Sequence, residues 1–589
     1  MIEVGQVTAV VGVEITIKAN ENSSLETHFY RGQAFKGVSI REYITVDHGF
    51  REVVCKVEGE YLDESHTEGK GPNLQYVRRL KVRPIGYFED EKFFDGIKFL
   101  PKIGDPAKLM SERKVEKIFE RTVSDGFKIG SLMKEDLPIS LPWQKIFNSH
   151  LGIFGNTGSG KSNTLTKLFT VLFENKFDTL ADISQFVFLD FNGEYTGEQL
   201  VDSGKKTVLR LKTRAAGGDQ FHLAESQFWD VETLGILFQA TANTQKPFLR
   251  RIVDDRKRFS VNVNSLTAYV KSIFRRVLNS EHPSAEALEL LKSLSRHLGI
   301  GDELAEALNK VGYHRNNQSF YFDSVRGSYF GVGNSTYDDH FGALVDAIEF
   351  EAPDGFRELQ IRAELKLISD LLYGSVQYEH IQPLMRRIEA LMGDFTKVIA
   401  IRQGDEEEGP VTVISLRECN QEIKKILPIL IAKHYYEEHK RRVSSPPDRT
   451  MHLVIDEAHN ILSQQSNREA ESWKDYRLEL FEEIIKEGRK FGAFMTLASQ
   501  RPADISPTVV SQLHNYFIHR LVNDRDLTLL ENTISTLDSI SRSQIPSLPQ
   551  GACVVTGTTF DIPMLLQVDK LPKEQEPDSS DVDLVDLWG

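Results

Sequence analysis

The stretch that most constrains this chain is Gly155-Asn-Thr-Gly-Ser-Gly-Lys-Ser162, which fits the pattern G-x-x-x-x-G-K-[ST]. Its glycines allow the backbone to turn tightly, so that several consecutive N–H groups point at the phosphates of a nucleotide. The apolar run His150–Phe154 precedes the stretch, and apolar side chains follow at helical spacing within Asn163–Phe173. A strand, a glycine-rich loop and a helix in this order predict a phosphate-binding loop. The alternative is a glycine-rich loop that binds nothing.

The predicted ligands of this loop are ATP and Mg²⁺. Lys161 is expected to reach the β- and γ-phosphates, and the hydroxyl of Ser162 is expected to bind Mg²⁺. The helix that follows directs the positive end of its dipole at the phosphates. The residues expected to surround the nucleotide are Gly155, Asn156, Thr157, Gly158, Ser159, Gly160, Lys161, Ser162 and Asn163.

Two further acidic residues follow a second apolar strand. The run Phe186–Asp190 ends in Asp190, and Glu194 comes shortly after it. Ligands of open α/β sheets bind at the carboxyl ends of the strands, so we expect Asp190 and Glu194 to face the nucleotide. The alternative is a polar turn that merely follows the strand.

A pair of carboxylates completes the predicted site. The buried-strand pattern of Leu453–Ile455 ends in Asp456 and Glu457. Asp456 is expected to hold Mg²⁺ through water, and Glu457 to polarise the attacking water as general base. The phosphate-binding loop and this acidic pair together indicate a nucleotide-hydrolysing enzyme.

A third strand and two arginines supply the remaining candidates. The apolar run Phe494–Ala498 is followed by Gln500, which is expected to orient water or to sense the γ-phosphate. Arg489 and Arg520 are candidates for stabilising the charge on the transferred phosphate. In some ATPases a neighbouring subunit supplies this arginine. For each arginine the alternative is a surface ion pair.

Composition excludes several classes of protein. The 71 basic and 86 acidic residues give a net charge of −15, which argues against a surface coated in positive charge but not against a basic channel. No apolar run reaches the ~20 residues that a membrane span needs. The start lacks a secretory signal, and the three cysteines are widely separated. We therefore expect a cytoplasmic protein with no membrane segment.

The sequence divides into several regions. Alternating apolar residues in Val11–Ile17 and Val53–Val57 predict a small β-barrel, with a surface loop at 63–72. Helical patterns such as Ser284–Leu298 dominate the middle of the chain. The tail is polar but closes with apolar residues, so it is either disordered or an arm that docks on a neighbour. The predicted regions are the β-barrel 1–85, a connector 86–140, the ATPase core in two parts 141–218 and 398–568, a helical insertion 219–397 between them, and the tail 569–589.

Three clusters of basic residues could bind DNA. They are Arg250–Arg251, Arg256–Arg258 and Lys440–Arg442. Charge clusters on helices are more often solvated faces, so neither interpretation is excluded at this point.

The combined motifs resemble the HerA-type hexameric ATPases of the HerA/FtsK group. The stretches that carry the resemblance are 150–162, Leu189-Asp-Phe-Asn-Gly-Glu-Tyr195, Val454-Ile-Asp-Glu-Ala-His459, Glu487-Gly-Arg-Lys-Phe-Gly492 and Ala498-Ser-Gln-Arg-Pro502. The resemblance implies a RecA-like P-loop ATPase core with an N-terminal barrel and a helical insertion. It also implies a homohexamer with ATP at each interface and double-stranded DNA in a central channel.

The resemblance assigns roles to individual residues and partners. The family's loop lysine corresponds to Lys161, its acidic pair to Asp456 and Glu457, and its polar sensor to Gln500. Which arginine acts across the interface is left open. Relatives work with a nuclease docked on the barrel, and others resemble this chain in antiphage defence beside a nuclease or a sirtuin-type NAD-consuming enzyme. The expected function is therefore an ATP-driven DNA translocase or helicase with such a partner; the alternative is a nucleotide-gated scaffold that activates it.

Overall fold

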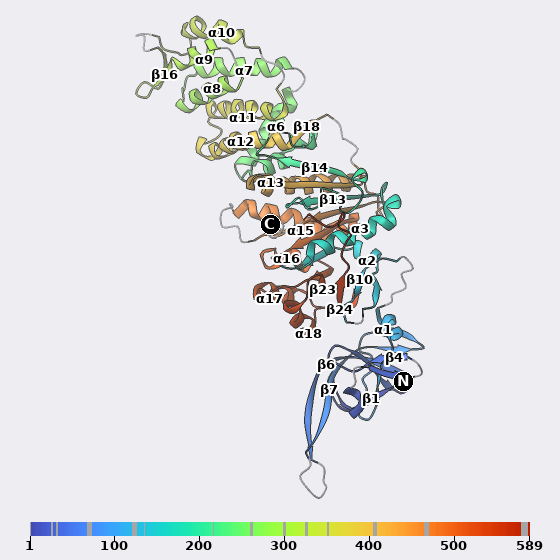
Figure 1. Cartoon of the computed structure of the whole chain (residues 1–589). Helices are drawn as coiled ribbons and strands as arrows, with labels where there is room; N and C mark the ends of the chain where they lie inside the picture. Colours follow the sequence, from blue (N-terminus) through green and yellow to red (C-terminus); the bar gives the residue numbers. More distant parts are fainter. Residues whose placement is uncertain are drawn as a thin grey trace. The chain divides into compact units, whose positions relative to one another are not determined.

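The computed structural model describes most of the chain, which forms two compact units (Figure 1). The first unit consists of residues 1–179, 198–201 and 494–589, and the second of residues 180–197 and 202–493. The described residues are 2–24, 27–30, 33–66, 74–119, 126–134, 136–215, 217–259, 263–298, 302–323, 328–349, 353–403, 409–464, 471–578 and 587–588.

The first unit begins with a small β-barrel of antiparallel strands. Its strand order is β2-β1-β9-β5-β6-β7, and pairing of β7 with β2 closes the sheet into a ring. Because β9 lies between β1 and β5, the barrel extends beyond residue 85. The strands are β1 (Glu3–Val11), β2 (Glu14–Ala19), β5 (Tyr43–His48), β6 (Arg51–His66), β7 (Leu74–Glu89), β9 (Pro106–Leu109), the additional β8 (Lys92–Asp95), and the separate hairpin of β3 (Thr27–Tyr30) and β4 (Gln33–Lys36).

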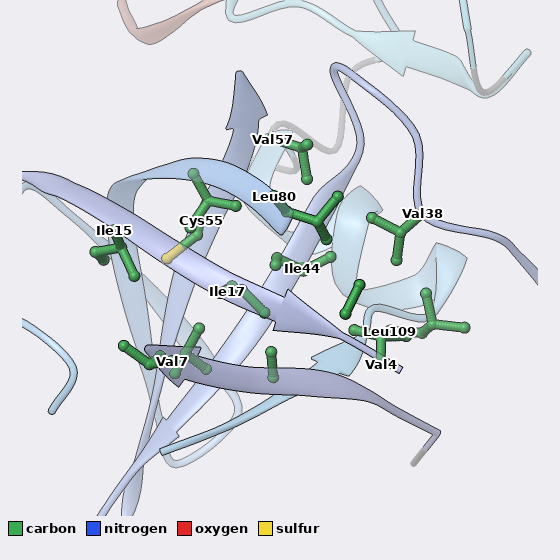
Figure 2. Packing of buried hydrophobic residues seen from close by; sticks show 14 of the residues in the cluster. Val4, Val7, Ile15, Ile17, Val38, Ile44, Cys55, Val57, Leu80 and Leu109 are labelled. Carbon is green, nitrogen blue, oxygen red and sulfur yellow. The ribbon is translucent and has the colours of Figure 1, made fainter. Parts of the chain in front are cut away.

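Small and branched apolar side chains fill the interior of the barrel (Figure 2). Successive side chains of a strand point to opposite faces, so the alternation seen in the sequence places one set inside. The interior residues include Val4, Val7, Ile15, Ile17, Val38, Ile44, Val46, Val53, Cys55, Val57, Leu80, Val82, Ala107 and Leu109.

The strands β6 and β7 continue together as a long hairpin (Figure 1). The surface loop predicted at 63–72 is wrong for residues 63–66, which belong to β6; residues 67–72 lie outside the described part. Asp63, one of the acidic residues that suggested a loop, is paired across the hairpin, since Arg79 Nε lies 2.6 Å from Asp63 Oδ2. Cross-strand ion pairs of this kind allow charged residues to remain in a strand.

The rest of the first unit is a mixed sheet with the phosphate-binding loop at one strand end. Its strands are ordered β11-β10-β24-β23-β22-β12-β21, with β12 parallel to β21 and β22. The strands are β10 (Lys128–Leu132), β11 (Pro138–Ser140), β12 (Leu151–Phe154), β21 (Ala493–Ser499), β22 (Asn515–Ile518), β23 (Ala552–Gly557) and β24 (Phe560–Val568). The helices are α1 (Glu112–Phe119), α2 (Trp143–Phe147), α3 (Lys161–Leu180), α16 (Pro507–Ser511), α17 (Asp524–Thr533) and α18 (Ser539–Gln544).

The second unit contains four parallel strands in the order β20-β13-β19-β14. Strands buried on both faces read as continuous apolar runs, which is the pattern of β13 and β20. The elements are β13 (Ser184–Asp190), β14 (Thr207–Lys212), β19 (Val411–Glu418), β20 (Thr450–Ile455), α13 (Gln421–Arg442), α14 (His459–Leu462) and α15 (Glu471–Glu487).

A helical region lies between β14 and β19 in the sequence. The parallel pair β15 and β18 forms where the chain enters and leaves it. Within it, α11 packs against α6, α7, α8 and α12, and Figure 1 shows the helices stacked in successive layers. The elements are β15 (Phe221–Ala224), α4 (Glu225–Phe228), α5 (Val231–Leu237), α6 (Gln245–Phe259), α7 (Val263–Leu278), α8 (Ala285–Leu298), α9 (Asp302–Asn309), β16 (Val311–His314), β17 (Ser319–Phe322), α10 (Ala343–Asp346), α11 (Gly355–Leu372), α12 (Tyr378–Val398) and β18 (Ile399–Arg402).

These elements confirm the predicted mixed α/β class with an N-terminal barrel and with the glycine-rich loop between a parallel strand and a helix. Among the residues that the structure describes, no helix has the length and apolar character needed to cross a membrane.

The barrel interior makes a first prediction. Leu80 is 0% exposed, whereas Leu62 on the same hairpin is 65% exposed. Leu80→Ala should lower the free energy of unfolding of the barrel by about 2–5 kcal/mol because it leaves a cavity, and Leu62→Ala should change it by less than about 0.5 kcal/mol. Hydrogen exchange of β6 and β7 amides in the full chain measures both values. Equal effects of the two substitutions would contradict the interior position of Leu80.

Candidate nucleotide-binding site

Two neighbouring strands hold the start of the phosphate-binding loop. The N–H of Gly155 donates to the carbonyl of Ser499 at the end of β21, at 3.2 Å. The N–H of Asn156 donates to the carbonyl of Arg520, just beyond β22, at 2.9 Å. Because β12 lies between these two strands, the loop leaves the sheet in a fixed direction.

Glycines are required at two positions of the loop by its backbone. Gly158 has φ +73° and Gly160 has φ +105°, a region that side chains disfavour. A Cβ atom on Gly160 would also lie 2.8 Å from the Cα of Gly551, whereas one on Gly158 would meet nothing within 4 Å. The close approach is fixed by a hydrogen bond from the N–H of Gly551 to the carbonyl of Ser159, at 2.9 Å.

The predicted sensor lies against the loop. The hydroxyl of Thr157 donates to Oε1 of Gln500 at 2.7 Å. Gln500 directly follows β21, the strand that also receives the N–H of Gly155. The structure therefore brings Gln500 to the phosphate-binding loop, as its place in the sequence predicted; its role as a sensor stays a prediction.

The buried His519 packs against the start of the phosphate-binding loop. A Cβ atom added to Gly155 would lie 2.5 Å from Cβ of His519. The side chain of His519 therefore occupies the space that the glycine leaves open. Burial, together with the positive charge of nearby Lys161, lowers the pKa of His519 to about 4. The ring is therefore neutral near pH 7 and adds no charge beside Lys161. His519 was not predicted, because its place after the apolar strand β22 is its only signal in the sequence.

Asn163 contacts the segment that follows β24. Its side-chain amide donates to the carbonyl of Asp569 at 3.1 Å, and its Oδ1 accepts from the N–H of Leu571 at 3.4 Å. The segment after β24 is thus attached to the first turn of α3. A contact between Asn163 and the nucleotide stays a prediction.

Asp190 shapes the loop that follows it in the second unit. Its Oδ1 accepts from the N–H groups of Asn192, Gly193 and Glu194 at 3.2, 2.7 and 3.0 Å, and its Oδ2 accepts from the N–H of Tyr195 at 3.0 Å. Burial raises the pKa of the Asp190 carboxyl to about 6, and these N–H groups oppose that rise. The polar turn weighed as the alternative is therefore what the geometry favours.

The turn connects to the acidic pair through a tyrosine. The buried hydroxyl of Tyr195 donates to Oδ2 of Asp456 at 3.2 Å, and the N–H of Glu457 donates to Oδ1 of Asp456 at 2.9 Å. Burial, followed by the charge of Asp456, raises the pKa of Tyr195 well above its usual value, so its hydroxyl keeps its proton. Both oxygens of Asp456 are thereby oriented. Tyr195 is the last residue of the stretch 189–195 that carries the resemblance, but no role was predicted for it.

Glu457 has an unusual conformation and a partner. Its φ is +49°, which is costly for a residue with a side chain and is found preferentially at functional sites. Its Oε2 lies 3.2 Å from Nδ1 of His459. Oε1 of Glu194 accepts from Nδ2 of Asn192 at 3.2 Å. That Glu194 faces the nucleotide stays a prediction.

The two candidate arginines have exposed side chains, whereas several residues of the basic clusters are paired with carboxylates. Arg520 holds the loop through its backbone carbonyl, and its side chain is exposed, as is that of Arg489. Four members of the basic clusters are paired with carboxylates: the pairs are Arg251–Asp370, Arg256–Glu225, Arg256–Glu358, Lys440–Glu483 and Arg442–Glu438. This pairing favours the solvated-face interpretation for these members of the clusters.

The residues fit Mg²⁺ without a dedicated protein cage. Within the described residues, no group of three or more His, Cys, Asp or Glu side chains is arranged to hold a metal. Mg²⁺ usually keeps several waters and is bound by one or two side chains together with substrate phosphates. Ser162 in the first unit carries a hydroxyl and Asp456 in the second unit carries an oriented carboxylate, which are both ligand types of that kind; their binding of Mg²⁺ stays a prediction.

A glycine-rich loop between a parallel strand and a helix, shaped by two glycines of positive φ, places the chain in the class of P-loop nucleotide triphosphatases. Residues 127–318 match the family described as "Helicase HerA, central domain". The resemblance to HerA-type ATPases predicted from the motifs is confirmed.

Similar proteins cover most of the chain. The DNA double-strand break repair helicase HerA of Sulfurisphaera tokodaii is 22% identical over 497 residues, which are 83% of this chain and 77% of the relative. The probable DNA double-strand break repair helicase HerA of Methanocaldococcus jannaschii is 22% identical over 542 residues, which are 90% of this chain and 94% of the relative.

Solved structures show a weaker likeness. VirB4 of Thermoanaerobacter pseudethanolicus has a TM-score of 0.42 and 12% identity, covering 77% of this chain and 100% of that chain. The plasmid coupling protein TrwB in complex with the ATP analogue ADPNP has a TM-score of 0.41 and 14% identity, covering 79% and 94%. At these TM-scores neither structure carries weight in assigning the fold, which the strand order of the chain itself defines.

Substitution of either loop glycine is expected to weaken nucleotide binding, and by different amounts. Gly160→Ala adds a Cβ atom that overlaps Gly551, and so should weaken the binding of a fluorescent ATP analogue by roughly 100-fold. Gly158→Ala meets no atom and suffers only the backbone strain of about 1–2 kcal/mol, so it should weaken binding by roughly tenfold. Fluorescence titration of the full chain measures both affinities. Unchanged affinity in Gly160→Ala would contradict a role of this loop in binding.

Tyr195 makes a third prediction. Tyr195→Phe removes a hydrogen bond to a charged acceptor, worth about 1.5–3 kcal/mol, and should lower kcat for ATP by roughly tenfold or more while leaving KM nearly unchanged. Tyr516→Phe is the matched control, because that buried hydroxyl donates to the carbonyls of Val510 and Leu513 instead. Steady-state turnover decides between them: equal kcat values in the two variants would remove the orienting role of Tyr195.

Proposed function

We propose that this chain is an ATP-hydrolysing DNA translocase or helicase of the HerA type. The observation that carries the proposal is the phosphate-binding loop, whose strand-end anchors, glycine conformations and contact with Gln500 form a site for a triphosphate. It is supported by the similarity over most of the chain to relatives named DNA double-strand break repair helicase.

We propose the following division of labour among its side chains. Lys161 binds the β- and γ-phosphates, and Ser162 and Asp456 hold Mg²⁺, the latter through water. Glu457 accepts a proton from the attacking water, and Gln500 orients that water or senses the γ-phosphate. Bound Mg²⁺ supplies neutralisation of the charge that develops on the phosphates.

The proposed assembly is a homohexamer with ATP at each subunit interface and double-stranded DNA in the central channel. A neighbouring subunit then supplies the arginine, for which Arg489 and Arg520 remain the candidates because both side chains are exposed. The three cysteines are buried free thiols, which suits the reducing cytoplasm that we propose as its location.

We propose that a partner enzyme, either a nuclease or a sirtuin-type NAD-consuming effector, docks on the barrel, in DNA end processing or antiphage defence. The barrel and its hairpin expose several large apolar side chains, which soluble surfaces usually limit. These are Val11, Phe50, Leu62, Tyr76 and Ile103. The same observation favours the second candidate function, a nucleotide-gated scaffold that binds and activates such an effector.

Turnover measurements test the function. Linear duplex DNA should raise the rate of ATP hydrolysis by the full chain, because a translocase couples hydrolysis to movement on DNA. Lys161→Ala should abolish turnover while leaving the oligomeric mass unchanged. Glu457→Gln should bind ATP normally but lose at least about 100-fold in kcat, since general-base catalysis contributes roughly 10²–10⁴-fold.

Mass measurement and DNA dependence separate the two candidate functions. A hexamer whose turnover is the same with every form of DNA would contradict the translocase and leave the scaffold. A monomer without affinity for ATP would contradict both. Normal turnover in Glu457→Gln would remove Glu457 from the role of general base.

A further inference from the structure

Basic residues from three separate elements meet at the start of α13, in the second unit. Thr213, just after β14, accepts through its hydroxyl oxygen a hydrogen bond from the N–H of Asn420, at 2.8 Å. The ammonium of Lys397, in the last turn of α12, donates to the carbonyl of Thr213 at 2.8 Å. These contacts bring together Arg214, which follows Thr213, and Lys424, in the first turns of α13. We define Arg214, Lys397 and Lys424 as the basic cluster.

For Arg214 and Lys424, no carboxylate among the described residues lies within ion-pair distance of the side chain. The nearby acids are engaged elsewhere: Glu418 pairs with Lys212 at 3.0 Å, and Asp394 accepts from Nδ2 of Asn420 at 2.7 Å. Glu422 shares the first turn of α13 with its side chain exposed.

The charge of Arg214 disfavours the charged form of Lys424. Burial, and also the charge of Arg214, lower the pKa of Lys424. Lys424 in addition lies near the positive end of the α13 dipole, where a cation is unfavourable. A chain with a net charge of −15 has many carboxylates with which it could neutralise such a site. The arrangement places two like charges near each other, in a position where an anion from outside the unit would neutralise them.

Several cations of the clusters visible in the sequence do have carboxylate partners. Arg256 contacts Glu225 and Glu358, and Lys440 contacts Glu483. The basic cluster is not visible as a run of charges, because its members come from different parts of the chain. Arg256 and Lys440 are therefore neutralised within the fold, whereas the described residues supply no such pair for Arg214 and Lys424.

We propose that the basic cluster binds the phosphodiester backbone of duplex DNA. This inference rests on the proposed function and adds the residues that would contact the DNA. A duplex presents one negative charge per ~1.7 Å of its axis, so it matches cations that are spread over several elements. A single terminal phosphate is instead typically bound in a loop of backbone N–H groups, as at residues 155–162. Arg214 and Lys424 supply the charge, and Lys397 holds the end of β14 in place through Thr213.

The test combines Arg214→Gln with Lys424→Gln in the full chain. The matched control combines Lys440→Gln with Arg442→Gln, at the other end of the same helix, where both cations are paired. The probe is a linear duplex of random sequence, with its affinity measured by fluorescence anisotropy at several salt concentrations. We expect roughly tenfold weaker binding for the test variant and a salt dependence reduced by about one to two units of slope. DNA-free ATP turnover should be unchanged, and the control should behave as the wild type.

A charge-preserving variant separates loss of charge from loss of fold. The combination Arg214→Lys with Lys424→Arg keeps both positive charges and should have the affinity and salt slope of the wild type. Wild-type affinity and slope in the Gln variant overturn this inference, while DNA-stimulated turnover of the wild type leaves the proposed function intact. Loss of DNA-free turnover also overturns it, because the cluster would then serve the nucleotide. A wild-type chain that binds no DNA overturns both.

Discussion

The site depends on one constraint: the backbone of the phosphate-binding loop must present its N–H groups outward while its start stays fixed to the sheet. Two strand ends provide the fixed points, through the carbonyls of Ser499 and Arg520. The close approach of Gly551 and of His519 then leaves room for glycine alone at positions 160 and 155. The residues that hold the loop are distributed over β12, β21, β22 and the turn before β23. Its conformation is therefore a property of the folded sheet rather than of the local sequence.

The acidic half of the chemistry is organised by a second set of buried contacts. Asp190 uses both carboxylate oxygens to shape the turn that ends at Tyr195, and Tyr195 orients Asp456. Burying carboxylates this near to one another is costly, because each disfavours the charge of the other. The N–H groups and the tyrosine hydroxyl offset that cost. Asp190, which the sequence placed among the nucleotide ligands, thus accepts the N–H groups of the turn that positions Tyr195.

The features that could be predicted from the sequence are those with local signals. The loop pattern, the apolar strands that end in Asp190 and Asp456, and the alternation in the barrel all have a fixed spacing. Gln500 was also predictable, because it follows an apolar strand within a recognised motif. The features that were missed depend on long-range contacts. They include the support of Gly155 by His519, the contact of Asn163 with the segment after β24, and the barrel strand β9, which pairs with strands far away in the sequence.

Charge shows the same division between local and long-range information. Runs of arginine and lysine stood out in the sequence, yet their members Arg251, Arg256, Lys440 and Arg442 are paired with carboxylates. Ion pairs of this kind explain how a chain of net charge −15 can contain conspicuous basic runs without a basic surface at those positions. Only the fold distinguishes neutralised cations from those that are not.

The most direct test of this account is a structure of the full chain with Mg²⁺ and a slowly hydrolysed ATP analogue. The account predicts that the β- and γ-phosphates lie against the N–H groups of residues 157–162 with Lys161 beside them, and that the metal is near Ser162. A nucleotide bound elsewhere, with an empty loop in which Thr157 and Gln500 keep their present contact, would contradict it.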